Sequence, residues 1–369
     1  MRIILLLSIA LALVAGCGAA PAGAADMGST RDMGPRPDTG PLPDTGPLPD
    51  TGPLPDTGPR RDMGVLPGSA HYFPAGAIWN TDVYDTPPAA NSAAQIAGLR
   101  AGGGWGNGDT FQMDLSIDVL TADATTPLRT FMPTGDFYDP DCDMQQVPIP
   151  VGGNIEGETG YECVSDGDCH LIVWVPVMNR LYEMWRANID ATDTFYGGCL
   201  AVWDTSRIYG PSGRGLQCTS ADAAGFPIAP LLFTADEVTA GEINHAIRFI
   251  LPNNRVQRGF VPPATHGTST TGGATAPYYG VHFRLRRDYD LASLPSDGAR
   301  VVARALQHYG MFHADGGNIA LTAQSDRHTT AHWDGLLDTH DLAALTVEDF
   351  EVIDHGASMP VTFDCVRAP

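Results

Sequence analysis

The sequence contains no lysine, and basic residues of any kind are scarce. Its 21 arginines stand against 43 acidic residues, so the formal net charge is −22 at pH 7. Nucleic acids and strongly anionic polysaccharides are bound through a surplus of positive charge, which this chain lacks. We therefore expect no nucleic-acid partner, although a local basic pocket is compatible with this balance.

Two signatures of known chemistry are also missing. The chain has no G-x-S-x-G pentapeptide, which disfavours a serine hydrolase whose nucleophile sits on a sharp strand-to-helix turn. It has no C-x2-C pair, so a zinc site built from cysteines is not expected.

The N-terminus has the composition of a secretory signal. Arg2 precedes an apolar stretch, residues 3–15, that is too short to span a bilayer as a helix of the mature protein. The stretch ends in small residues followed by Cys17, which resembles the processing site of bacterial lipoproteins. That resemblance implies a signal peptide over residues 1–16, a lipid on Cys17 and, because residue 18 is glycine, delivery to the outer membrane. An ordinary signal peptide that is cut near residue 20 is the alternative.

A proline-rich segment follows. Residues 35–64 repeat a hexad of the type PLPDTG. Proline at this density fixes φ and removes backbone donors, so the segment favours extended polyproline-like structure over packing. We expect residues 17–68 to form a disordered stalk and residues 69–369 to form a single β-rich globular domain. The domain would be membrane-anchored and displayed outside the cell envelope, facing a polysaccharide or another cell-surface partner.

Cysteine usage agrees with an oxidising compartment. Six cysteines remain once Cys17 is set aside, and an even number in an exported chain indicates three disulfides. By nearness in the sequence, the expected pairs are Cys163–Cys169, Cys199–Cys218 and Cys142–Cys365.

Short strands are expected to dominate the fold. Glycine (42) and proline (30) are abundant, and long helical periods are scarce, which favours strands joined by turns. The clearest hairpin joins residues 170–177 to 181–187, and the longest helix is expected over 298–309, capped by Asp297. We predict a mainly β fold, an antiparallel β-sandwich of jelly-roll type with one longer helix and several short ones, pinned by disulfides.

The second strand of this hairpin supplies the first candidate catalytic residue. Strand alternation places Glu183 on the same face as Trp185. A carboxyl against an aromatic wall tends to have a raised pKa, as a general acid needs. Pairing of Glu183 with Arg186 at a sheet edge is the structural alternative. His170, at the head of the neighbouring strand, is expected near Glu183.

Three further candidates lie between residues 219 and 249. Asp222 belongs to the segment TSADAAG, and Asp236 stands inside the capping box that opens at Thr234, so Asp236 is also explained as a first-turn acid. His245 falls on the apolar face of an expected strand over 243–251, where a hydrogen-bonded core histidine is the alternative.

Metal ligands are suggested at two places. Asp139, Asp141 and Asp143 are spaced two apart, as in calcium loops, but the glycine and distal glutamate of an EF-hand are missing. His328 and His332 have the spacing of helical ligands, but their segment is typical of a loop. We predict no cofactor and no metal site, with Ca²⁺ at 139–143 kept as the alternative to a solvated, disulfide-pinned loop.

Much of the globular part resembles a large family of secreted bacterial proteins that has no assigned reaction. The resemblance is carried by TSADAAG-x-PI, DEV, GEI and HA-x-RF between residues 219 and 249, and by YGM and AD-x-G between 309 and 316. It implies one continuous domain and matched positions at Glu183, Asp222, His245 and Asp315. It implies no mechanism.

We expect a surface-anchored, carbohydrate-active enzyme, a glycoside hydrolase or, as a second choice, a lyase, acting on an extracellular polysaccharide. The expected catalytic residues are Glu183, Asp222, Asp236 and His245. The expected substrate-binding residues are His170, Trp185, His266 and Asp315. A non-catalytic module that binds glycan or protein, or a structural envelope lipoprotein, is the alternative. Convergence of Glu183 and a second carboxyl on one cleft would favour the enzyme.

Overall fold

The structure, a computed structural model, describes residues 72–165, 167–354 and 356–368. All of them belong to one compact unit. The expected signal peptide, lipidated Cys17 and stalk lie outside the described residues. Within the described ranges, no helix has both the length and the apolar character needed to cross a membrane.

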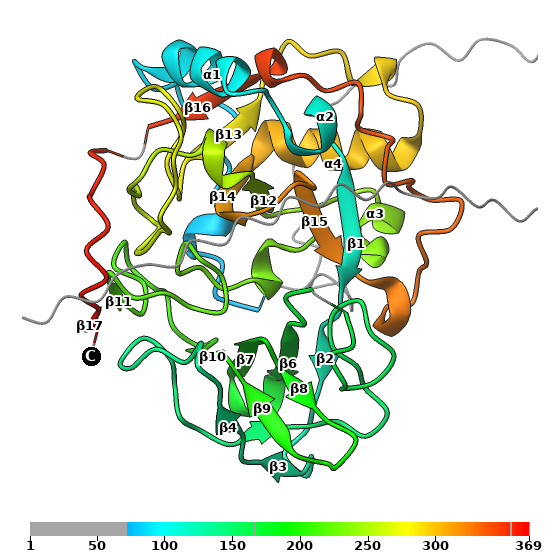
Figure 1. Ribbon diagram of the computed structural model, residues 1–369. Helices are drawn as coiled ribbons and strands as arrows, with labels where there is room; N and C mark the ends of the chain where they lie inside the picture. The colour runs from blue at the N-terminus through cyan, green and yellow to red at the C-terminus, as the bar shows by residue number, and fades with distance from the viewer. Residues whose placement is uncertain (1–71, 166, 355, 369) are drawn as a thin grey trace, which may run out of the picture. The chain divides into compact units, whose positions relative to one another are not determined.

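A six-stranded sheet forms the centre of the unit (Figure 1), in the order β1-β15-β12-β14-β13-β16. Its strands are β1 (Met113–Ile117), β12 (Ile247–Leu251), β13 (His282–Leu285), β14 (Met311–Gly316), β15 (Leu321–Gln324) and β16 (Phe350–Ile353). β1 pairs with β15 and β12 with β14 in parallel, whereas the remaining pairs are antiparallel. The prediction of an all-antiparallel architecture is therefore wrong for this sheet, because between the parallel strands β12 and β14 the chain first crosses back through β13, which is antiparallel to β14.

Helices are few and mostly short. The α-helices are α1 (Ser92–Ala101), α2 (Gly106–Asp109), α3 (Ala235–Ala240) and α4 (Asp297–His308). The 3-10 turns are η1 (Ile78–Asn80), η2 (Pro176–Met178), η3 (Ala229–Leu231), η4 (Asn253–Arg255), η5 (Leu291–Ser293), η6 (Asp326–His328) and η7 (Val347–Asp349). α4 packs on β13, and its Val302 and Leu306 are fully buried, so that each stabilises the fold by about 1.5–3 kcal/mol. The cap of α4 is Ser296, one residue before the predicted Asp297, because the Ser296 hydroxyl accepts the Ala299 N–H at 3.1 Å.

A four-stranded sheet, in the order β10-β7-β6-β2, contains the predicted hairpin. Its strands are β2 (Leu120–Thr121), β6 (Leu171–Val175), β7 (Arg180–Trp185) and β10 (Cys199–Asp204). β6 and β7 are antiparallel and meet at Asn179, whose φ of 50° closes the turn. Leu181 and Trp203 on one face join the main core, whereas Val173 and Met184 on the other face belong to a second apolar cluster.

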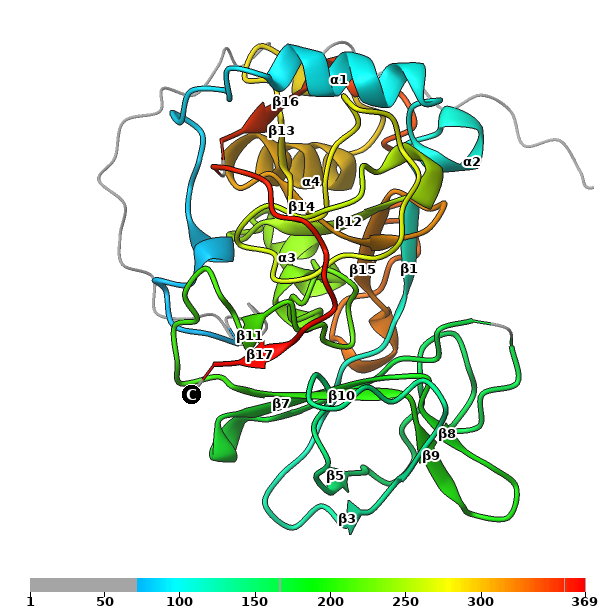
Figure 2. The ribbon, with the colours of Figure 1, turned by 60° about the vertical axis from the view of Figure 1, so that its left-hand side comes forward.

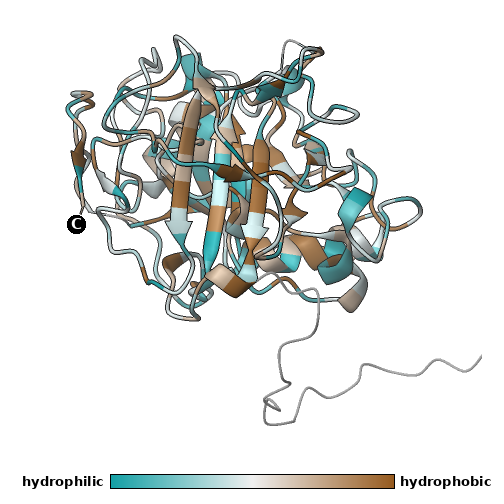
Figure 3. Ribbon diagram, turned by 90° about the horizontal axis from the view of Figure 1, so that it is seen from below, coloured by the Kyte–Doolittle hydropathy of each residue, from teal (hydrophilic) through white to brown (hydrophobic). Residues whose placement is uncertain are grey.

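Three small sheets complete the strands. They are β3 (Leu128–Arg129) with β5 (Val147–Pro148), β4 (Met132–Pro133) with β9 (Phe195–Gly197) and β8 (Asn188–Ile189), and β11 (Gly215–Leu216) with β17 (Val366–Arg367). In Figure 3 the strands at the centre of the view are mostly brown, whereas the loops around them mix white and teal. The mainly β composition with few helices is confirmed.

Three disulfides are present, as predicted, but only Cys163–Cys169 has the predicted partner. The other two are Cys142–Cys199 and Cys218–Cys365. Strand pairing explains the correction, because β17 adds to β11 and thereby carries Cys365 next to Cys218. Cys142 lies beside the start of β10, where the Asp143 N–H donates to the Leu200 carbonyl at 2.8 Å. Three disulfides are typical of an oxidising compartment.

Candidate functional site

A cavity of about 690 Å³ is lined by residues from both larger sheets and from the loops between them. Four of its aromatic residues are Tyr138, Trp185, Tyr279 and Phe363. Its acidic residues are Asp139, Asp141, Asp168 and Asp315. Of the eight predicted catalytic and binding residues, Trp185, His266 and Asp315 line this cavity.

Parallel pairing of β12 and β14 explains where Asp315 lies. The two strands run in the same direction, with Arg248 opposite Phe312 and Ile250 opposite Asp315. Because parallel strands end at the same edge of a sheet, Asp315 and Asn253, which follows β12, reach the cavity together.

Arg248 holds two acidic residues at this edge. Its guanidinium binds the fully buried Asp222 carboxylate through Nε at 3.0 Å and Nη2 at 2.9 Å. Nη2 also lies 3.4 Å from Oδ2 of Asp315. Burial raises the pKa of Asp315 well above its usual value, and the neighbouring Asp222 carboxylate raises it further. A raised pKa favours the protonated form of Asp315, which is the form that a general acid needs.

The loop that carries Asp222 is fixed by backbone contacts. Gly225 has φ of 78°, and a Cβ at this position would collide with Oγ1 of Thr265, so only glycine fits. The Ala224 N–H donates to the Ala314 carbonyl at 2.8 Å, and the Ala223 N–H donates to Oδ2 of Asp315 at 3.3 Å. The segment TSADAAG therefore forms one wall of the cavity and orients Asp315.

His266 lies against the same loop. Its Nδ1 donates to the Ala223 carbonyl at 2.8 Å. Burial lowers the pKa of His266 below its usual value, so the ring is neutral at pH 7. A neutral imidazole that donates from Nδ1 has its lone pair on Nε2, which makes His266 a hydrogen-bond acceptor for a ligand.

His170 lies behind the wall rather than in the cavity. Its Nδ1 is 2.6 Å from Oε2 of Glu156, and its Nε2 contacts the carbonyl of Ala221 at 3.2 Å. Burial lowers the pKa of His170, but the Glu156 carboxylate outweighs this effect and raises that pKa to about 9. A charged imidazolium therefore donates to Ala221 and positions the residue before Asp222.

Two carboxylates approach the cavity from the four-stranded sheet and its loops. Asp168 accepts a hydrogen bond from Nε1 of Trp185 at 2.9 Å, which fixes the indole that was predicted to bind substrate. Asp141 is 8% exposed, and its Oδ2 accepts the Thr219 N–H at 2.8 Å. Both carboxylates are therefore oriented by their donors.

Glu183, predicted as the general acid, is not among the residues that line the cavity. It is 0% exposed, and its carboxyl accepts the indole N–H of Trp203 and the backbone N–H groups of Ile228 and Ala229. Burial raises the pKa of Glu183 to about 7, against the effect of these donors. The alternative partner, Arg186, instead pairs with Asp136 at 3.2 Å. Glu183 therefore joins β7 to η3, and the expected convergence of Glu183 with a second carboxyl on one cleft is not found at this cavity.

Asp236 and His245 also have structural partners away from the cavity. Asp236 accepts the backbone N–H groups of Thr330 and Ala331 at 3.1 and 2.6 Å. His245 lies 3.3 Å from Glu237, the residue that completes the predicted capping box. β12 begins at Ile247 rather than at the predicted residue 243, because the Ala246 N–H bonds to the Trp79 carbonyl at 2.7 Å.

The residues considered as metal ligands bind other side chains instead of converging on one ion. Asp143 binds Arg214 at 2.6 Å and Arg367 at 2.8 Å, so it does not converge with Asp139 and Asp141 on one ion. His328 contacts Asn154 at 2.9 Å and His332 contacts Asp326 at 3.4 Å. In the described ranges, one group has metal-like spacing, Glu158 with Cys163 and Cys169, and its cysteines form a disulfide.

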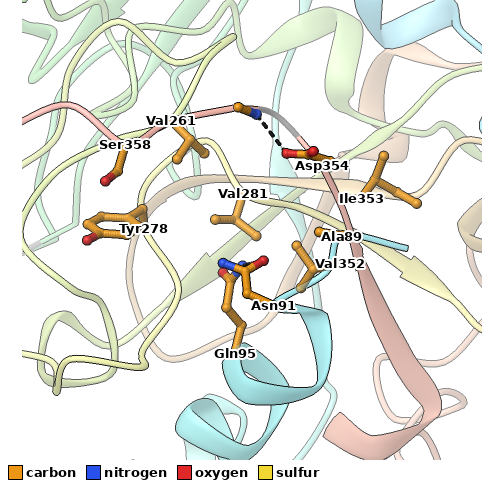
Figure 4. Close-up of a pocket in the computed structure, with 11 residues that line it drawn as sticks. Ala89, Asn91, Gln95, Val261, Tyr278, Val281, Val352, Ile353, Asp354 and Ser358 are labelled. Carbon is orange, nitrogen blue, oxygen red and sulfur yellow. Dashed lines mark hydrogen bonds between the residues drawn. The ribbon is translucent and has the colours of Figure 1, made fainter. Parts of the chain in front are cut away.

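A second, smaller cavity of about 110 Å³ lies beside the start of α1 (Figure 4). Asn91 and Gln95 point toward Val281 there, and Tyr278 lies on the other side. Asp354 accepts the Gly356 N–H at 2.8 Å instead of facing a ligand. No predicted site residue lines this cavity, so the larger cavity is the stronger candidate.

Sequence reasoning missed several contributors to the larger cavity. Arg248 stood inside the HA-x-RF motif, but a single arginine on a strand gives no sign of its counter-ions. Neither Tyr279 nor Phe363 was singled out as a candidate, and Asp141 was considered only as a calcium ligand. Comparison with protein-family models, curated proteins and solved structures found no match for this chain.

Proposed function

We propose that the protein is a glycoside hydrolase that acts on a neutral extracellular polysaccharide, with Asp315 as the general acid. The observation that carries the proposal is the meeting of a carboxyl of raised pKa with aromatic rings and further carboxylates in one cavity. Among the described residues, no arginine lines this cavity. With a net charge of −22, the site suits a neutral sugar better than a uronate.

The reaction assigns a role to each group. Asp315 donates its proton to the glycosidic oxygen as the bond to the sugar carbon breaks. A water molecule forms the new bond to that carbon, and Asp141, oriented by the Thr219 N–H, accepts the proton that this water loses. Asp222 acts through Arg248 and Asp315 and is a positioning residue. His266 accepts a sugar hydroxyl, and Trp185 stacks against a sugar ring.

The proposed location follows from the N-terminal sequence and the disulfides. A lipid on Cys17 would hold the chain at the outer membrane, and residues 17–68 would extend the domain toward polysaccharide. Three disulfides agree with export to an oxidising compartment.

The test is a screen of the purified full chain against neutral and acidic polysaccharides, with new reducing ends and unsaturated uronate measured together. Wild type, Asp315→Asn and Asp141→Asn are compared, and Asp193→Asn is the surface control. Reducing ends from wild type and the control, with none from folded Asp315→Asn, support the hydrolase. Product from Asp315→Asn at the wild-type rate contradicts it. Unsaturated uronate would identify a lyase instead.

One observation favours a non-catalytic sugar-binding module as the second candidate. Both oxygens of Asp315 accept backbone N–H groups, from Gly316 at 2.7 Å and from Ala223 at 3.3 Å, as those of a structural residue would. If no polysaccharide in the screen yields product but wild type and Asp315→Asn are both retarded on a glycan gel, the binding module replaces the hydrolase.

A further inference from the structure

Two aromatic side chains at the cavity rim have no part in the proposed reaction. Tyr138 and Phe363 are 52% and 51% exposed, yet both line the cavity together with Trp185. A half-exposed aromatic ring leaves apolar surface in contact with water. Binding of a ligand that covers this surface removes it from water, which is favourable.

The backbone at Phe363 supports a role in binding. Its φ is 62°, in the left-handed region that is unfavourable for a bulky residue with a Cβ. The ring lies edge-on to His266, with centroids 5.5 Å apart. Strained residues that persist at exposed positions cluster at ligand sites. The strained backbone therefore belongs to a residue, Phe363, whose ring lines the cavity.

The C-terminal strap, residues 356–368, fixes Phe363 in place. Figure 2 shows it running from the region of β16 down to β17 beside β11. The Cys218–Cys365 disulfide fastens it next to the TSADAAG wall. Gln217 strengthens this attachment, because its side chain donates to the Pro360 carbonyl and accepts the Thr362 N–H, each at 2.9 Å.

Tyr138 lies on the facing wall, the 134–146 loop, which is fastened in the same way. The Cys142–Cys199 disulfide ties this loop to β10. Arg367 of the C-terminal strap then joins the two walls, since its guanidinium donates to Oδ1 of Asp143 at 2.8 Å and to the Asp141 carbonyl at 3.0 Å. The two segments that carry the exposed rings are therefore fastened before any ligand arrives, which lowers the entropy cost of ordering them on binding.

We infer that Tyr138 and Phe363 form a second sugar subsite at the cavity rim, so that the ligand is a chain of sugar units rather than a monosaccharide. A pyranose ring has an apolar C–H face that stacks on an aromatic ring and hydroxyl edges that bond to carboxylates. Asp139, next to Tyr138 on the same wall, supplies such a carboxylate. This subsite rests on the proposed function, because it binds the same chain that Asp315 cleaves.

The test measures the affinity of the full chain for cello-, chito- and malto-oligosaccharides of one, two, four and six units by calorimetry. For at least one series, affinity rises with length. Phe363→Gly and Tyr138→Ala each raise the Kd of the hexamer roughly tenfold, the effect of losing one stacking ring, and leave Kd for the shorter members less affected. Glycine is chosen at 363 because it accepts the φ there without strain.

Two exposed residues outside the cavity lining serve as matched controls. Val366 on the C-terminal strap and Met144 on the 134–146 loop are 69% and 57% exposed. Val366→Ala and Met144→Ala are expected to keep the wild-type Kd, and thermal melting checks that every variant is folded.

The outcomes separate the subsite from the proposed function. If wild type binds a hexamer and both ring variants bind it equally well, the subsite is overturned. The hydrolase is judged separately, by whether Asp315→Asn loses activity. If wild type binds none of the probes, the subsite is overturned as well. If folded Asp315→Asn binds the hexamer without cleaving it and the ring variants bind it weakly, both are supported.

Discussion

Replacement of Asp222 by asparagine would remove one charge from the buried network beneath the cavity. Asp222 is fully buried and is bound by Arg248 through two hydrogen bonds of 3.0 and 2.9 Å. Breaking a buried ion pair by removing one partner costs about 3–5 kcal/mol. Because Asp315 still lies 3.4 Å from Arg248, the arginine keeps one counter-ion. We therefore expect the free energy of unfolding to fall by about 3 kcal/mol, at the lower end of that range.

The same substitution also lowers the pKa of Asp315, the proposed general acid. Burial and then the Asp222 carboxylate raise the pKa of Asp315. Asp222→Asn removes the second effect. The positive charge of Arg248 then acts on Asp315 alone, so the pKa of Asp315 falls. Asp315 is then ionised over a wider pH range, and hydrolysis that depends on its proton decreases at pH 7 and recovers at lower pH.

Two measurements check this prediction. Urea unfolding at pH 7 gives the loss of stability, and the carboxyl carbon resonance of Asp315, followed against pH, gives its titration. Asp193→Asn is the matched control, because Asp193 pairs with Arg129 at 2.9 Å on the surface, where such a pair contributes about 0–1 kcal/mol. The reasoning is refuted if Asp222→Asn is no more destabilising than the control and the titration of Asp315 does not move.

Three further predictions concern stability. The Glu156 carboxylate raises the pKa of His170 to about 9 in the folded state, above the usual 6.5, so its contribution of about 3 kcal/mol is full below pH 6.5 and is lost as pH rises through 9. His170→Gln should therefore flatten this part of the stability profile, which urea unfolding at pH 6 and pH 10 would show; an unchanged slope would contradict the Glu156 pairing. Glu183→Ala leaves three N–H donors without an acceptor and should cost about 3–5 kcal/mol in urea unfolding, with sugar binding retained; unchanged stability would argue against its structural role. Removal of the Cys218–Cys365 disulfide, with a sequence separation of 147, should cost about 5 kcal/mol, and an unchanged melting temperature of the double alanine variant would contradict this.

Local patterns in the sequence predicted local structure well. The hairpin of β6 and β7, helix α4 and the capping box at Thr234 depend on neighbours within a few residues, and all three are confirmed. The number of disulfides follows from counting cysteines. Their partners do not, because Cys365 reaches Cys218 only through the pairing of β17 with β11.

The candidate site depended on contacts that alternation alone does not encode. The pattern correctly placed Glu183 beside apolar residues, and the pKa of Glu183 is indeed raised. It did not reveal that backbone N–H groups at the start of η3 would bind Oε1 of Glu183 and that the Trp203 indole would bind Oε2. Asp315 and Asp222 were identified as candidates, but Arg248, which joins them, is explained only by the parallel pairing of β12 and β14. Tyr138 and Phe363 reach the cavity through loops whose path depends on the disulfides Cys142–Cys199 and Cys218–Cys365, and these pairings were not predicted.

The most direct test of the central claim is a crystal structure of the Asp315→Asn variant soaked with the oligosaccharide that wild type cleaves. The account predicts a sugar chain in the cavity, with the glycosidic oxygen within hydrogen-bond distance of residue 315 and sugar rings against Trp185 and Phe363. A chain bound elsewhere, with residue 315 out of reach of any glycosidic oxygen, would contradict the assignment of Asp315 as the acid.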